Sequence, residues 1–265
     1  MPGEQELRAA LDRVHFRSPR DAWVLVETLR DFAVATKAAL GDDIVSVYVN
    51  GSLTMGDFEP ASSDIDFLVV TSRPLGEGDL SRVTRVHEEI AGKPFGDRLE
   101  GSYAAMARLR PWGIEGDLLF TEPGMQPTFG PGDYSADNMW ALRHAAVPLV
   151  GPMPEAVMPD VDDKTLRAGL RQYLGELRVR SSGVSDENLP SCLLNMARCM
   201  FGIDFGRACT KHEAAHWLLS REPELEPGLT GALQVRSGMA ELQSRAEVMR
   251  IAVAAVASLS DGFLS

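Results

Sequence analysis

The hydrophobic pattern of the chain changes near its middle, and its first part mixes two periodicities. Apolar positions at helical spacing, interleaved with charged residues, predict a helix over residues 20–40. The other regular segments of this part are expected from β-branched runs or from helical spacing: strands at 44–49, 65–70, 99–109 and 118–121, and a helix at 81–90. The first part is therefore expected to combine a sheet with helices.

The second part of the chain has the pattern of helices alone. Beyond Gly151 no stretch has the composition of a convincing strand. Apolar stripes at helical spacing predict three helices, at 166–177, 193–201 and 235–259. We therefore expect an α+β fold, with a mixed sheet and helices in a domain at 1–150 and an all-α helical domain at 151–265.

Composition and charge narrow the class of protein. The chain has 265 residues, 45% hydrophobic and 24% charged, and a formal net charge of −12, as expected for a folded globular protein. No apolar run is long enough to span a membrane, and no secretory signal is visible, so we expect a cytoplasmic protein. An acidic chain without a Lys/Arg block disfavours nucleic acid as a partner and favours a cationic small molecule.

The cysteines do not predict a metal site or a disulfide framework. Cys192, Cys199 and Cys209 lack the paired C-x-x-C spacing of zinc ligands, and three cysteines cannot all pair with one another. We expect reduced thiols in or near the core.

Candidate chemistry lies between the first two predicted strands. Gly51-Ser52 follows the first strand, and Asp64-Ile65-Asp66 opens the second. Residues i and i+2 of a strand point to one face, so the two carboxylates are expected to project together, whereas Ile65 points to the core. Like charges in one small volume favour a divalent cation, and Mg²⁺ with phosphate ligands fits best. Solvated acids at an exposed strand end are the alternative for the aspartates alone.

This constellation resembles a known superfamily. The stretch N-G-S-L-T-M-G-D-F-E-P-A-S-S-D-I-D-F-L-V-V (50–70) is similar to the G-S…D-x-D signature of the DNA polymerase β-like nucleotidyltransferases, and in detail to the aminoglycoside adenylyltransferases that modify streptomycin and spectinomycin. The segment 149–154 is similar to the family's link to a C-terminal helical bundle. Arg198 and Lys211, followed by Ala214, Ala215 and Trp217, are similar to the family's R…K-x-x-A-x-x-W stretch.

The resemblance implies roles for individual residues. Asp64 and Asp66 would bind two Mg²⁺ ions and take part in catalysis, while Gly51, Ser52, Lys211 and Arg198 would bind ATP, the co-substrate. Glu100, in an L-E context similar to the family's, would be the base that accepts the hydroxyl proton. Asp117 is the competing third carboxylate, and the sequence leaves that choice open.

The helical part offers further candidates for binding. Thr210 to Glu213 fits a capping box, which places Lys211 in the first turn of a helix, where a phosphate is favoured by both the lysine and the helix dipole. Arg198 could contact phosphate or pair with a carboxylate. Asp186 and Glu187 lie near where the resemblance places acids that bind a cationic drug, although their loop composition is also typical of a solvated turn.

Together these observations predict an ATP- and Mg²⁺-dependent O-nucleotidyltransferase that adenylylates a hydroxyl of a streptomycin- or spectinomycin-type antibiotic and releases pyrophosphate. The resemblance implies a role in antibiotic resistance, and the sequence alone leaves that role open. We expect a monomer, because the expected ATP site draws on both domains of one chain. Two alternatives remain at this stage: an AMP-transferase that acts on a protein or metabolite hydroxyl, and a non-catalytic nucleotide-binding regulator. The sequence does not choose between ATP, GTP and CTP.

Overall fold

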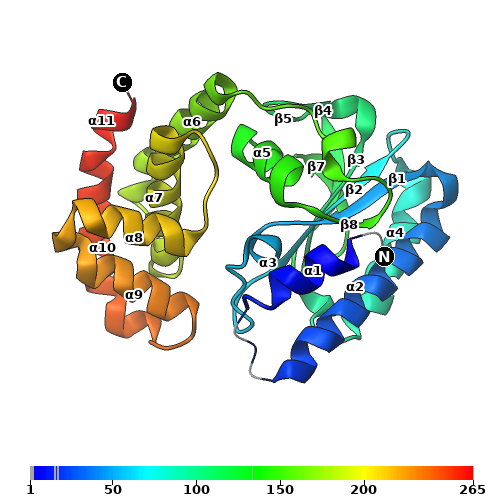
Figure 1. Cartoon of the computed structure of the whole chain (residues 1–265), viewed down its shortest axis with the longest axis horizontal. Coiled ribbons are helices and arrows are strands. Elements are labelled where there is room, and N and C mark those ends of the chain that lie inside the picture. The colour runs from blue at the N-terminus through cyan, green and yellow to red at the C-terminus, as the bar shows by residue number, and fades with distance from the viewer. Residues whose placement is uncertain (1–2, 15, 17, 133, 265) are drawn as a thin grey trace. The chain divides into compact units, whose positions relative to one another are not determined.

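The chain folds into two units. The structure is a computed structural model that describes residues 3–14, 16, 18–132 and 134–264, and its units are Met1–Asp160 and Val161–Ser265 (Figure 1). The sequence pattern placed the change of domain at residue 150. Arg143 extends the first unit beyond that residue, because its guanidinium donates to the carbonyls of Glu155 and Met158 at 2.9 and 2.7 Å.

A six-stranded mixed sheet forms the centre of the first unit. Its strand order is β7-β6-β3-β2-β1-β8. The strands are β1 (Ile44–Val49), β2 (Ile65–Thr71), β3 (Leu99–Ala105), β6 (Asp117–Thr121), β7 (Thr128–Pro131) and β8 (Val147–Val150), and a separate hairpin contains β4 (Leu109–Arg110) and β5 (Gly113–Ile114). Neighbouring strands are antiparallel except β2 and β3. Because parallel neighbours need a crossover, helix α4 (Glu77–Ala91) connects these two strands.

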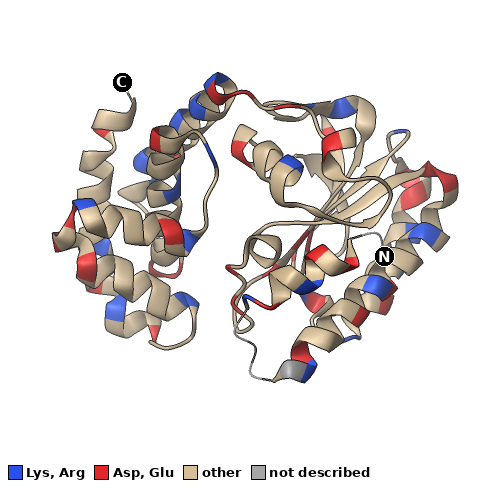
Figure 2. Cartoon of the chain, viewed as in Figure 1, with Lys and Arg blue, Asp and Glu red and all other residues tan. Residues whose placement is uncertain are grey.

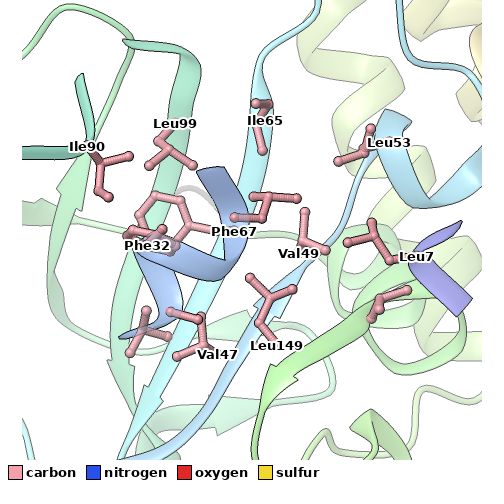
Figure 3. Close-up of a cluster of buried hydrophobic side chains, with 14 of the residues drawn as sticks. Leu7, Phe32, Val47, Val49, Leu53, Ile65, Phe67, Ile90, Leu99 and Leu149 are labelled. Atoms are coloured by element: carbon pink, nitrogen blue, oxygen red, sulfur yellow. The ribbon is translucent and has the colours of Figure 1, made fainter. Parts of the chain in front are cut away.

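Three helices supply the main hydrophobic core of this unit against one face of the sheet. They are α1 (Glu4–Leu11), α2 (Pro19–Leu40) and α4, and they contribute Leu7, Phe32 and Ile90 to the cluster in Figure 3. The rings of Phe32 and Phe67 meet edge to face with centroids 4.9 Å apart. Burial of such side chains stabilises a fold by about 1.5–3 kcal/mol each.

The alternation along β2 fixes which side chains leave this core. Ile65 and Phe67 are buried in the cluster, as the sequence predicted. Asp66 lies between them and therefore projects from the opposite face of the sheet. The same alternation in β3 buries Leu99 and Tyr103 in the core and sends Glu100 to the face of Asp66.

The predicted strands and helices of this unit are present, with one correction and several additions. The expected strand over 99–109 ends at Ala105, because a 3-10 turn, Met106–Arg108, interrupts it before β4. The elements outside the predictions include α1, α3 (Ser52–Met55), β5, β7, α5 (Ala136–Ala145) and β8. The strands β7 and β8 are only four residues long and contain prolines, so tertiary pairing rather than local pattern determines them.

The second unit is entirely helical among its described residues. Its helices are α6 (Asp163–Ser181), α7 (Leu189–Phe205), α8 (Lys211–Arg221), α9 (Glu226–Arg236), α10 (Leu242–Leu259) and α11 (Asp261–Leu264). Helix α7 is buried along most of its length and packs against α6, α8, α9 and α10. The observed fold class, an α+β unit followed by a helical unit, confirms the prediction from the sequence pattern.

The long last helix expected over 235–259 was wrong. Helix α9 ends at Arg236, and α10 begins at Leu242. Gly238 adopts a φ of +70° between them, and the amides of Met239 and Ala240 both donate to the carbonyl of Gln234. This pattern ends a helix at a left-handed glycine, which the apolar periodicity does not reveal.

Other expectations concern thiols and membranes. Cys192, Cys199 and Cys209 are all buried and form no disulfide, as predicted. None of the described helices combines the length and the hydropathy that a bilayer crossing needs. Lys and Arg occur on several helices of both units with Asp and Glu beside them (Figure 2).

One polar pair is buried inside the core of the first unit. The Nε2 atom of His87, on α4, lies 2.9 Å from the Tyr103 hydroxyl on β3. The rings of Phe32 and Phe67 pack against the imidazole at centroid distances of 5.8 and 5.7 Å. Burial in these surroundings lowers the pKa of His87 to about 4. The imidazole is therefore neutral in the folded protein at neutral pH.

This pair predicts a pH dependence of stability. The unfolded imidazole has a pKa of about 6.5, so between that pH and about 4 the unfolded state binds a proton that the folded state does not. The contribution of His87 is complete above pH 6.5 and declines as the pH falls, by at most about 1.4 kcal/mol per pH unit. His87→Gln keeps a hydrogen-bonding partner for Tyr103 and removes the titration.

Urea unfolding of both proteins between pH 4.5 and 7.5 checks this. Every other titrating group is common to both and cancels in the difference. We expect the free energy of unfolding of the unsubstituted protein to fall relative to that of His87→Gln as the pH is lowered. Parallel curves would contradict the buried neutral state of His87.

Candidate functional site

The turn after β1 brings backbone into direct contact with a carboxylate. Gly51 follows the strand with φ +68°, and a Cβ atom placed on it would lie 1.9 Å from Oδ2 of Asp66. The amide of Asn50 donates to the carbonyl of Asp66 at 3.0 Å, which ties the turn to the start of β2. Only glycine leaves room here for the Asp66 carboxylate. The turn leads into the single-turn helix α3 (Ser52–Met55), so Ser52 lies beside the carboxylate's strand.

Strand register brings a second carboxylate to Asp66. In the parallel pairing of β2 with β3, Asp66 lies opposite Glu100. Asp64, one residue before β2, is exposed and near enough to share a hydrogen bond with the Glu100 carboxyl. Asp64, Asp66 and Glu100 are thus brought together at one end of neighbouring strands. A hydrogen bond between two carboxyl groups requires one of them to hold a proton.

The carboxylates of this cluster repel one another when they are ionised. Burial raises the pKa of Glu100 to about 7, and the neighbouring charges of Asp66, Asp64 and Glu122 act in the same direction. A group that binds at the cluster and carries positive charge relieves this repulsion. The cluster therefore has the character of a binding site rather than of a stabilising feature.

The residues around this turn offer oxygen donors for a metal ion. In the part of the chain that the structure describes, no group of three or more His, Cys, Asp or Glu side chains is placed to hold a metal ion by itself. Mg²⁺ needs fewer protein ligands than such a group supplies, because one or two carboxylates together with substrate phosphates and water complete its coordination shell. In addition, the Oδ1 atom of Asn50 is buried with no hydrogen-bond partner among the described residues, as in a site completed by a bound group. The oxygen donors fit Mg²⁺ bound together with a phosphate ligand.

Two other carboxylates, one at the beginning of β6 and one just after its end, differ in their position relative to this cluster. Asp117 is exposed at the beginning of the strand and pairs with Pro131 of β7. Glu122 comes directly after the strand's other end, and its charge acts on Glu100. The structure therefore brings Glu100, and not Asp117, to the two aspartates. Sequence reasoning missed Glu122, because its proximity depends on a strand pairing that the sequence does not reveal.

In the second unit, Lys211 lies at the start of α8, and Arg198, on α7, contacts the segment that precedes α8. The Thr210 hydroxyl accepts from the amide of Glu213 at 3.0 Å, so Thr210 is the N-cap and Lys211 is in the first turn, as predicted. Nε of Arg198 donates to the carbonyl of Cys209 at 3.0 Å. Arg198 therefore holds the segment that leads into this helix, in place of the carboxylate partner considered from the sequence.

The other half of the expected capping box is replaced by an ion pair. The Glu213 carboxylate pairs with Arg207, whose guanidinium also lies 4.7 Å from the centroid of the Phe201 ring. Asp186 and Glu187 begin a 3-10 turn before α7 and are exposed. The Asp186 carboxylate pairs with Arg250 on α10, an exposed ion pair of the kind that contributes little to stability.

Comparisons with known proteins agree with this geometry. Residues 31–102 match the sequence family described as "Nucleotidyltransferase domain", a span that includes the Gly51 turn, both aspartates and Glu100. The fold resembles the crystal structure of spectinomycin adenyltransferase AAD(9) from Enterococcus faecialis with ATP and spectinomycin. The TM-score is 0.71 at 17% identity, over 88% of this chain and 98% of that chain.

A second solved structure is more distant. It is a STING-associated CdnE c-di-GMP synthase from Capnocytophaga granulosa, with a TM-score of 0.30 and 14% identity over 98% of this chain and 88% of that chain. This likeness is too low to support an inference. Residues 31–102 thus match a nucleotidyltransferase domain, and the fold of the chain is similar to that of AAD(9).

Proposed function

We propose that this nucleotidyltransferase transfers the AMP group of ATP to a hydroxyl of an aminoglycoside or aminocyclitol antibiotic of the streptomycin and spectinomycin type. The observation that carries the proposal is the meeting of Asp64, Asp66 and Glu100 beside the Gly51 turn, inside the matched domain. The acceptor class is supported by the fold shared with a spectinomycin adenyltransferase and by the chain's net charge of −12, which attracts a cationic acceptor.

Glu100 is the proposed base. It accepts the proton of the acceptor hydroxyl, whose oxygen forms a bond to the α-phosphorus of ATP. The bond from that phosphorus to the bridging oxygen breaks, and pyrophosphate leaves with the electron pair. A carboxylate with a raised pKa is suited to this role, because general bases are most efficient when their pKa lies near the working pH.

Asp64 and Asp66 are the proposed ligands of Mg²⁺. When bound, Mg²⁺ supplies positive charge that stabilises the attacking and leaving oxygens of an in-line displacement. The two carboxylates hold that charge at the end of β2 beside Ser52, whose hydroxyl is proposed to donate to a phosphate oxygen. Gly51 has no side chain, so the turn leaves room for a ligand to approach the carboxylates.

The helical unit is proposed to contribute to nucleotide and drug binding as well. Lys211 lies in the first turn of α8, where the helix dipole and the ammonium charge both favour a phosphate. Arg198 orders the segment before this turn and is the second proposed phosphate ligand. Asp186 and Glu187 are exposed carboxylates that suit a cationic drug.

Pyrophosphate release tests the proposed reaction. The protein is incubated with ATP, Mg²⁺ and one drug at a time, with streptomycin, spectinomycin and a set of other aminoglycosides as acceptors. We expect release that depends on one of these drugs. Asp66→Asn removes a charge that binds the metal, and we expect it to lower the rate by at least about 100-fold, as losing an electrostatic stabiliser of the transition state does.

Asp117→Asn is the matched control, since it makes the same chemical change on an exposed residue at the far end of β6. We expect it to keep the rate of the unsubstituted protein. ATP binding without release in the presence of any drug contradicts the acceptor class and directs the search to protein or metabolite hydroxyls. Equal loss in both variants contradicts the assigned site.

Gly51→Ala tests whether the turn positions Asp66. The added Cβ would overlap the Asp66 carboxylate, and alanine is also strained at φ +68°. Gly41→Ala is the matched control, because Gly41 has φ +59° with nothing within 4 Å of the added Cβ. Urea unfolding should show a loss of about 1–3 kcal/mol from backbone strain in both variants. Only Gly51→Ala should also lose pyrophosphate release, and equal activity of the two variants contradicts the positioning role.

A further inference from the structure

Glu122 occupies a fixed position next to the proposed base. In the antiparallel pairing of β3 with β6, Gly101 lies opposite Thr121, and the same register continued by one residue beyond β6 places Glu122 opposite Glu100. Residues directly opposite in such a pair share a face, with Cβ atoms about 4.5–5.5 Å apart. Asp66, Glu100 and Glu122 therefore form a row of carboxylates across β2, β3 and the end of β6.

The backbone that carries Glu122 is rigid. The carbonyl of Glu122 accepts from the amide of Met125 at 3.0 Å across Pro123 and Gly124, and Gly124 has φ +74°. Proline followed by a glycine with positive φ is the signature of a type II turn. The Thr121 hydroxyl also donates to the carbonyl of Met125 at 3.1 Å. The backbone of Glu122 is thus held at this edge of the sheet by the turn as well as by the strand that precedes it.

The charge of Glu122 has no evident structural purpose. It is exposed, and no Lys or Arg among the described residues forms an ion pair with it. Like charges directly opposite each other destabilise a sheet. Two carboxylates of the cluster are assigned to Mg²⁺ and one to the base, so the fourth remains without a role in the proposed reaction.

We infer that Glu122 determines acceptor specificity by binding an ammonium group of the substrate close to the hydroxyl that Glu100 deprotonates. This inference rests on the proposed function and narrows its substrate class. The preferred acceptor carries a protonated amine near the reacting hydroxyl on the same ring, because the two carboxylates are cross-strand neighbours. A neutral polyol fits the base but leaves the Glu122 charge uncompensated.

The test compares Glu122→Gln with the unsubstituted protein and with Asp117→Asn, which removes a charge from the other end of the same strand. The acceptors are spectinomycin, streptomycin and their N-acetylated forms, which lack the positive charge of the amine. Kinetics give KM for acceptor and for ATP, and calorimetry with a non-hydrolysable ATP analogue gives the Kd of each acceptor. Glu122→Asp keeps the charge and serves as the conservative variant.

For the drug that supports turnover, we expect Glu122→Gln to raise KM and Kd for that drug by about 10-fold or more, the scale of a lost charge-assisted hydrogen bond. KM for ATP should stay within about twofold, Glu122→Asp should restore part of the affinity, and the N-acetylated drug should bind both proteins equally weakly. Asp117→Asn should match the unsubstituted protein.

If Glu122→Gln binds the drug as tightly as the unsubstituted protein, the inference is wrong. The proposed function still stands in that case, provided that drug-dependent pyrophosphate release is lost in Asp66→Asn. Equal increases in KM for drug and for ATP also overturn the inference, because they indicate a structural role for Glu122. Absence of drug-dependent release in the unsubstituted protein overturns the proposed function, and this inference with it.

Discussion

Repulsion between carboxylates at the end of β2 and β3 is the constraint on which the site depends. The core fixes the faces of both strands, since Phe67 and Tyr103 must be buried, and this forces Asp66 and Glu100 to the same opposite face. Asp64 adds a further charge, and burial raises the pKa of Glu100 to about 7. Packing energy from the rest of the unit thus holds together groups that repel one another. The proposed binding of a cation together with a nucleotide would relieve this repulsion.

Each unit holds its proposed site residues with its own backbone. The Gly51 turn fits against the Asp66 carboxylate because it has no Cβ atom, and the type II turn at 122–125 fixes a further carboxylate at the edge of the sheet. The helical unit places Lys211 at the capped start of α8, with Arg198 bound to the preceding backbone. Each unit by itself therefore offers one kind of polar group: carboxylates at the sheet of the first unit, and a lysine at a capped helix start in the second.

The sequence predicted the parts of the fold and of the site that local pattern controls. The β-branched runs gave β1 and β2 nearly to the residue, and alternation gave the faces of Ile65 and Asp66. Local pattern does not predict which strands pair. The register of β3 with β2 and β6 was therefore needed to choose Glu100 over Asp117 and to find Glu122. The prediction of a single helix over 235–259 was wrong because apolar periodicity does not reveal the left-handed conformation of Gly238, which ends the first of two helices there.

The central claim is that the carboxylates at the end of β2 bind a divalent metal with ATP. The most direct measurement is the anomalous diffraction of crystals grown with Mn²⁺, in place of Mg²⁺, and a non-hydrolysable ATP analogue. The account predicts an anomalous peak within coordination distance of Asp64 and Asp66, with a phosphate oxygen of the analogue in the same shell. Bound nucleotide with no metal at these two carboxylates, or with metal only elsewhere, would contradict it.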